Sequence, residues 1–175
     1  MSVHRLTGLA LLTAQSLALF VLESLLPLPV PVPGAKLGLA NIITLVALYI
    51  LPRPRDALLI LLLRTMLAAV FFGGPSMYIY SAGGALVSFA AMAALKKSGV
   101  FSVVGVSAAG GFCHNLAQLF LAVCVAGSSA LWHYLPVLGS VGVLSGALLG
   151  VASSRIIKRL SAERYVKNFR SRLRN

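Results

Sequence analysis

The chain has 175 residues, of which 59% are hydrophobic and 10% are charged, and its formal net charge is +12. Its mean hydropathy of +0.95 excludes an ordinary soluble domain and indicates an integral membrane protein. Because one membrane-crossing helix needs about 20 apolar residues, the chain has room for six short-looped spans within one domain.

Apolar runs between helix breakers predict the membrane-spanning elements. Six transmembrane helices are expected near residues 5–26, 36–52, 56–73, 78–95, 100–126 and 133–156. We therefore expect an all-α integral membrane protein, with a six-helix transmembrane domain over residues 1–156 and a basic amphipathic tail over residues 157–175. The loops at residues 51–56 and 96–99 are basic, which predicts cytoplasmic N and C termini in a multi-pass protein of the cytoplasmic membrane. The tail is typical of a segment that binds membrane lipid, not nucleic acid.

The first predicted helix carries small residues on one face. Ala10, Ala14 and Ala18 recur at four-residue spacing, which lets another helix approach closely. That spacing serves either a partner protein or packing within the same chain, and the sequence leaves both open. The apolar run lacks a small-x-small cleavage site at its end, so we expect this helix to remain in the mature protein.

A proline-rich segment, residues 27–35, leads into the second predicted helix. Its alternating prolines predict an extended conformation, which suits either a lid over an outer pocket or a stiff connector. Lys36 follows at the outer start of the helix, where it either attracts an anion together with the helix N-terminus or reaches to lipid headgroups. Asn41 lies deeper and needs a hydrogen-bonding partner.

Arg64 lies near the middle of the third predicted helix. An Arg at the centre of a membrane helix costs about 2.5–3.5 kcal/mol on insertion scales, so such residues face a bundle interior, a cavity or an anionic group. The partner of Arg64 is either internal, a counter-ion such as Glu23 or a ring of carbonyls, or an anionic ligand. The sequence does not distinguish between the two.

The fourth and fifth predicted helices carry further polar side chains. Tyr80, near the outer start of the fourth helix, fits an aromatic belt at the membrane surface or stacking on a planar ligand. His114, Asn115 and Gln118 share one face of the fifth helix. This face either satisfies its hydrogen bonds across the bundle or lines a ligand pocket, and the depth of Arg64 favours the pocket. One histidine among amides does not form a ligand set for a metal ion, so no metal site is predicted.

Several motifs carry a resemblance to a known family. They are the run Pro-Gly-Ala-Lys-Leu-Gly-Leu-Ala-Asn at residues 33–41, Tyr49, Arg64, the run Ser-Ala-Gly-Gly at residues 81–84, and His114-Asn115-x-x-Gln118. Together they resemble the Gx transporter family, also labelled heptaprenyl diphosphate synthase component I. The resemblance implies a six-helix bundle similar to the substrate-binding S components of energy-coupling factor transporters. It implies that Ala10, Ala14 and Ala18 face a transmembrane coupling protein, which works with ATPase subunits.

The same resemblance implies that residues 27–35 close over an outward-facing pocket. The expected substrate-binding residues are Lys36, Asn41, Arg64, Tyr80, His114, Asn115 and Gln118. An enzymatic role is not expected, because trans-prenyltransferases hold magnesium diphosphate with clustered aspartates and Asp56 is the single aspartate here. No nucleotide-binding loop and no catalytic Ser/His/Asp set occurs in the sequence either.

The sequence therefore predicts a membrane component that binds or transports a small anionic organic molecule, such as a vitamin or a quinone or isoprenoid precursor, with separate energising subunits. No cofactor is predicted, and no run of the type that attaches a flavin is present. One alternative is a membrane subunit of a quinone-linked or extracytosolic electron-transfer system, with which relatives in this family are associated. Another is a membrane scaffold for a soluble prenyl diphosphate synthase, which would explain the family label and the basic tail.

Overall fold

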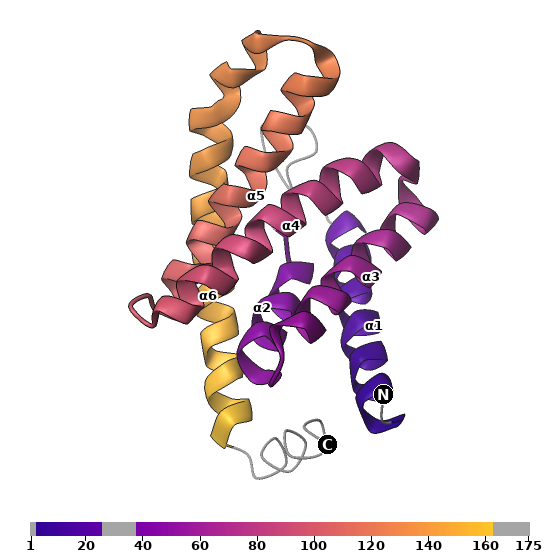
Figure 1. Cartoon of the computed structure of the whole chain (residues 1–175), viewed down its shortest axis with the longest axis vertical. Helices are drawn as coiled ribbons and strands as arrows, with labels where there is room; N and C mark the ends of the chain where they lie inside the picture. Colours follow the sequence, from indigo (N-terminus) through magenta and orange to yellow (C-terminus); the bar gives the residue numbers. More distant parts are fainter. Residues whose placement is uncertain (1–2, 26–37, 163–175) are drawn as a thin grey trace.

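The computed structural model describes residues 3–25 and 38–162, and within these ranges the chain forms six α-helices, one short 3₁₀-helix and no strand (Figure 1). The helices are α1 (Val3–Leu25), α2 (Ala40–Ile50), α3 (Pro54–Phe72), α4 (Gly74–Ser98), α5 (Val103–Ala126), the 3₁₀-helix η1 (Ser129–Tyr134) and α6 (Leu135–Ala162). The predicted all-α fold is confirmed.

The largest differences between the helix boundaries and the predicted ones are at the starts of the second and fourth helices and the end of the sixth. The second helix begins at Ala40, because Gly38 has a φ of +82°, a left-handed conformation that an α-helix does not continue. The fourth begins at Gly74, since Pro75 fits the first helical turn, where no backbone N–H is needed. The sixth runs on to Ala162, so the first residues of the predicted tail continue α6; residues 163–175 lie outside the described residues.

Glycines bring α5 and α6 into close contact, and Figure 1 shows the two helices running side by side. A Cβ atom added to Gly142 would lie 2.6 Å from the carbonyl oxygen of Gly111, and one added to Gly146 would lie 2.5 Å from that of Ser107. Backbone atoms cannot move aside as a flexible side chain can. The glycines of α6 thus let the two backbones touch, as small residues do in membrane helices.

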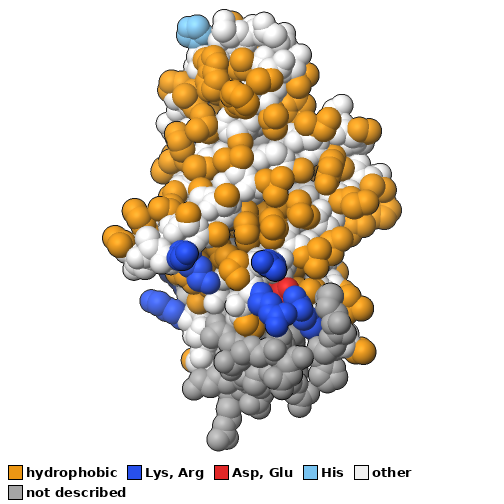
Figure 2. Space-filling model, in the orientation of Figure 1, with side chains coloured by type: hydrophobic (Ala, Val, Ile, Leu, Met, Phe, Trp, Pro, Cys, Tyr) orange, Lys and Arg blue, Asp and Glu red, His pale blue; other side chains and the backbone are white. Residues whose placement is uncertain are grey.

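The interior and the outer surface of the bundle are both apolar. The most deeply buried large side chains are Leu45 and Leu48 of α2, Ile60 and Leu61 of α3, and Val106 of α5. Exposed hydrophobic side chains cover much of the face shown in Figure 2. A water-soluble protein rarely exposes so large an apolar surface, whereas a lipid-facing surface requires one.

Four segments of the described part are long and apolar enough to cross a membrane. They are Arg5–Leu25, Gly74–Ser98, Val103–Ala126 and Ser129–Ala162. The described part of α2 is short, with 11 residues, and α3 has 19 residues that include three charged side chains. The helix lengths and composition are those of a helical membrane protein.

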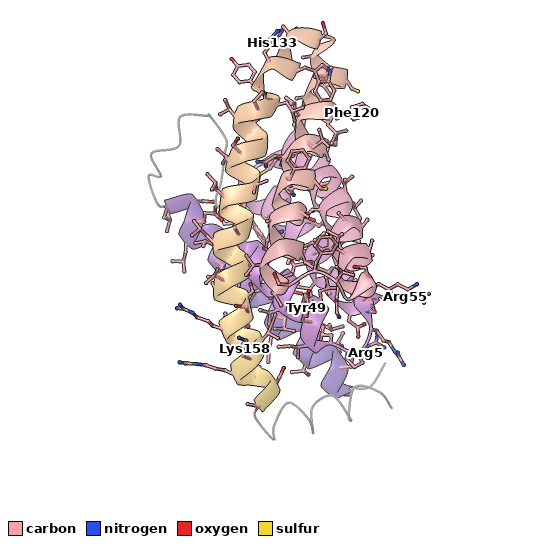
Figure 3. All side chains as sticks on the ribbon, turned by 90° about the vertical axis from the view of Figure 1, so that its left-hand side faces the viewer. Arg5, Tyr49, Arg55, Phe120, His133 and Lys158 are labelled. Carbon is pink, nitrogen blue, oxygen red and sulfur yellow. The ribbon has the colours of Figure 1, made fainter. Side chains whose placement is uncertain are left out.

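Basic side chains gather at one end of the bundle, which we call the basic end. It consists of the start of α1 and α3 and the close of α4 and α6, with Arg5, Arg53, Arg55, Lys96, Lys97, Arg155, Lys158 and Arg159. Figure 2 shows this cluster of blue atoms, and Figure 3 places Arg5, Arg55 and Lys158 at the end opposite His133. The bundle is thus strongly asymmetric in charge along its long axis.

Polar contacts tie the helices together at the basic end. Arg5 of α1 forms an ion pair with the buried Asp56 of α3. Lys96 of α4 donates a hydrogen bond to the backbone carbonyl of Leu48 of α2 at 2.5 Å, and its ammonium lies 5.0 Å from the ring centre of Tyr49. Each contact joins two helices that are not consecutive in the chain.

Candidate binding cavity

A cavity of about 580 Å³ lies within the bundle, and residues of all six α-helices line it. Its polar and charged lining residues are Glu23, Asn41, Arg64, Thr65, Tyr80, Ser81, Ser88, Ser107, His114, Asn115, Gln118 and Ser145. Its larger apolar lining residues are Phe20, Leu45, Met77, Met92, Leu119, Leu138 and Leu149. Sites for small organic molecules measure about 300–1,000 Å³ and combine such apolar walls with a few polar groups.

Arg64 is the cation in the described wall of this cavity. Its side chain is only 8% exposed, although it lies in the middle of α3. One Nη2 hydrogen is donated to the side-chain oxygen of Asn41 on α2, at 3.0 Å. The Nε atom is buried without a hydrogen-bond partner. A guanidinium has five N–H donors, so most of its capacity is not used by the described residues.

Glu23 lies in the same wall but does not neutralise Arg64 through an ion pair. Its carboxylate oxygens accept the backbone N–H groups of Gly38 at 2.6 Å and Leu39 at 2.9 Å, immediately before α2. These two bonds satisfy donors that a helix leaves unpaired at its N-terminus. Among the described residues, no acid forms an ion pair with Arg64. The internal pair that the sequence left open is therefore not formed.

The fifth helix supplies further polar residues of the cavity wall. His114, Asn115 and Gln118 all line the cavity, and Asn115 donates from its side-chain nitrogen to the carbonyl of Leu138 on α6, at 2.7 Å. The Nδ1 atom of His114 is buried without a partner. A Cβ atom at Gly84 of α4 would lie 3.0 Å from the His114 ring and 2.8 Å from the Gln118 side chain. The glycine in α4 thus makes room for this polar face.

The cavity brings together six of the seven side chains that the sequence singled out as substrate-binding. They are Asn41, Arg64, Tyr80, His114, Asn115 and Gln118. Lys36 and the proline segment 27–35 lie outside the described residues. The position of the six is an observation, and their role toward a ligand stays a prediction. In the part of the chain that the structure describes, no three His, Cys, Asp or Glu side chains are grouped as a metal site would require.

The small-residue face of α1 points away from the bundle. Ala10, Ala14 and Ala18 are all exposed, while α1 contacts α2 and α3 along other parts of its surface. A coupling protein at this face stays a prediction.

Glycines of α6 make close helix contacts that the sequence did not lead us to expect. Gly142, Gly146 and Gly150 repeat there at four-residue spacing. That spacing is the signal by which they could have been found.

These features define a class: a helical membrane protein whose bundle contains a mostly apolar cavity with a few polar groups and a buried arginine in its wall. Within that class, the chain belongs to the family described as heptaprenyl diphosphate synthase component I, whose model matches residues 12–156. The family resemblance stated from the sequence motifs is thereby confirmed. No curated protein and no solved structure matched the chain. The similarity to S components of energy-coupling factor transporters stays a prediction.

Proposed function

We propose that this protein is a multi-pass component of the cytoplasmic membrane that binds a small anionic organic molecule in the central cavity. In this proposal it delivers the molecule as part of a transport system whose energising subunits are separate chains. The observation that carries the proposal is Arg64, a buried cation in a cavity wall that uses one described hydrogen bond and no described ion pair. Intramembrane charges without a structural partner are the usual mark of a substrate or ion pathway.

The charge asymmetry supports an orientation for six spans. Cytoplasmic segments of membrane proteins carry an excess of Lys and Arg, so the basic end and both chain termini face the cytoplasm. Arg64 follows Pro54, the first residue of α3, by about 15 Å of helix. The charge therefore lies at membrane depth, away from the ion pair and hydrogen bonds that hold the basic end together. Entry to the cavity from the outer side agrees with this arrangement.

The exposed face of Ala10, Ala14 and Ala18 supports a partner within the membrane. Small side chains let a second helix approach closely, and no described helix of the chain uses this face. In the proposed assembly, the coupling protein docks there, and ATPase subunits supply the energy. The chain alone is not an enzyme in this proposal. It has three acidic residues in total, and in the cavity wall Glu23 is held by two backbone N–H groups.

The family description favours one second candidate, a membrane scaffold for a soluble prenyl diphosphate synthase. This candidate needs no ligand in the cavity. It predicts that removing the charge of Arg64 has no effect on any bound molecule. The two candidates therefore differ in what the protein carries when it is isolated from its membrane.

Native mass spectrometry of the detergent-purified protein tests the proposal. We expect a small molecule to copurify with the wild type and to be lost from Arg64→Gln. The matched control is Arg155→Gln, which removes the same charge from an exposed position near the end of α6. Wild-type protein that carries no molecule, while all three proteins unfold at similar temperatures, would contradict the proposal and favour the scaffold. A copurifying chromophore with visible absorbance would favour the electron-transfer alternative.

A further inference from the structure

The described wall of the cavity contains one formal positive and one formal negative charge. Arg64 and Glu23 are its ionisable side chains apart from Tyr80 and His114, which count as neutral. The described lining therefore has no net charge. Lys36 lies outside the described residues.

A single guanidinium matches one planar anionic group. Its N–H donors form a fixed planar fork, and a carboxylate accepts two of them in parallel. The Asn41 side chain accepts one Nη2 hydrogen and holds the fork in place, while the other donors are not taken by described residues. The amide of Gln118 and the hydroxyl groups of Tyr80 and Ser81 line the same cavity. One carboxylate would thus find a charged partner and further hydrogen bonds.

A diphosphate does not match this wall. It carries at least two negative charges, and proteins hold such groups with several basic side chains or with Mg²⁺ bound by carboxylates. Glu23 is the single carboxylate in the described lining, and each of its oxygens already accepts a backbone N–H group, so the described wall does not provide the clustered carboxylates that hold Mg²⁺. Its own charge also repels a second anionic group. An excess negative charge inside the bundle would remain uncompensated, which costs several kcal/mol.

We infer that the cavity selects an organic acid with one planar anionic group and an apolar body, and that it rejects a prenyl diphosphate despite the family description. This inference rests on the proposed function and narrows its ligand. The apolar body would lie against side chains such as Phe20, Met77, Met92 and Leu119, which complete the wall. The cavity then recognises the head group by charge and the body by shape.

Three probes with the same ten-carbon body separate the head groups: geranic acid, geraniol and geranyl diphosphate. Binding to the full chain in lipid nanodiscs is measured by calorimetry, with and without Mg²⁺, for wild type, Arg64→Gln and the control Arg155→Gln. We expect the wild type and the control to bind geranic acid about tenfold to a hundredfold more tightly than geraniol. Arg64→Gln should lose this difference. Geranyl diphosphate should bind more weakly than geranic acid under both conditions.

Several results would overturn the inference, and they are distinct from failure of the proposed function. Tighter binding of geranyl diphosphate than of geranic acid, lost in Arg64→Gln, would leave the binding cavity in place but remove the single-charge preference. Equal binding of geranic acid and geraniol, or binding of neither, would also overturn it. So would phosphorus in a molecule that copurifies with the wild type. The proposed function itself fails where no molecule copurifies, or where the copurifying molecule is retained in Arg64→Gln.

A second variant tests the reason for the selectivity. Glu23→Gln removes the negative charge from the wall and keeps a side-chain oxygen that accepts an N–H group at the start of α2. If the charge of Glu23 excludes a second anionic group, the affinity ratio of geranic acid to geranyl diphosphate should fall about tenfold in this variant. An unchanged ratio in a variant that still binds geranic acid would contradict the charge argument.

Discussion

Two arginines lie among the apolar helices of this protein, and their surroundings differ. Arg5, at the basic end, forms an ion pair with Asp56, whose side chain is 3% exposed. Arg64, in the cavity wall, donates to a neutral amide, and the nearby carboxylate of Glu23 accepts backbone N–H groups instead. At the basic end the charges satisfy each other and hold helices together. In the cavity Glu23 acts on Arg64 electrostatically but forms no direct ion pair with it, so that Arg64 keeps donors for another molecule.

Among the substitutions that test this difference between the two arginines, the largest loss of stability is expected at Asp56. Asp56→Asn leaves Arg5 without its counter-ion, and removing one member of a buried ion pair costs about 3 kcal/mol or more. We expect a clearly lower unfolding temperature in detergent than for Arg55→Gln, a charge change on the exposed neighbouring side chain. Equal unfolding temperatures for the two variants would show that the Arg5–Asp56 pair does not hold the basic end together.

A smaller effect is expected at Lys96, beside an adjacent lysine that serves as the control. Lys96→Gln removes the hydrogen bond to Leu48 and the contact with the Tyr49 ring, whereas the Lys97 side chain is exposed. The loss should destabilise the protein by about 1 kcal/mol. Lys97→Gln should leave the unfolding temperature unchanged. If the two variants unfold at the same temperature, the contacts of Lys96 do not stabilise the basic end.

The smallest effect is expected for the coupling between Arg64 and Glu23. A double-mutant cycle with Arg64→Gln and Glu23→Gln should give a smaller coupling free energy than the ion pair at the basic end, because Glu23 acts on Arg64 electrostatically without a direct ion pair. The corresponding cycle for Arg5 and Asp56 should exceed about 1 kcal/mol. Both cycles are measured by equilibrium unfolding. A coupling of similar size in the two cycles would remove the difference between the two arginines.

The helical fold and much of the cavity wall followed from local properties of the sequence. Apolar runs predict membrane helices. A polar side chain inside such a run needs a hydrogen-bonding or charged partner in the bundle interior. That reasoning singled out Arg64, Asn41 and His114, all of which line the cavity. The fourth helix was expected to end at residue 95, before a basic loop, but α4 includes both lysines and ends at Ser98, where Gly99 takes a left-handed conformation.

Other features depend on contacts between distant residues and could not be read locally. Glu23 was a candidate partner for Arg64, but the start of α2 provides two N–H groups that hold its carboxylate instead. The short 3₁₀-helix η1, before α6, was expected to belong partly to a continuous helix. The contact between Gly111 and Gly142 joins α5 and α6. The four-residue spacing of the α6 glycines indicates close helix packing but does not identify the partner helix.

We expect small polar molecules to reach the space around Arg64 from the outer side of the membrane. To measure this access, a membrane-impermeant anionic methanethiosulfonate reagent is reacted with Ser81→Cys, in a background where Cys113 and Cys124 are replaced by Ala. Ser81 lines the cavity, and Ser153→Cys is the control, because Ser153 is fully buried. We expect reagent added from outside to modify Ser81→Cys and not Ser153→Cys. If neither cysteine reacts, the cavity around Arg64 is not open to polar molecules from outside, which contradicts our expectation.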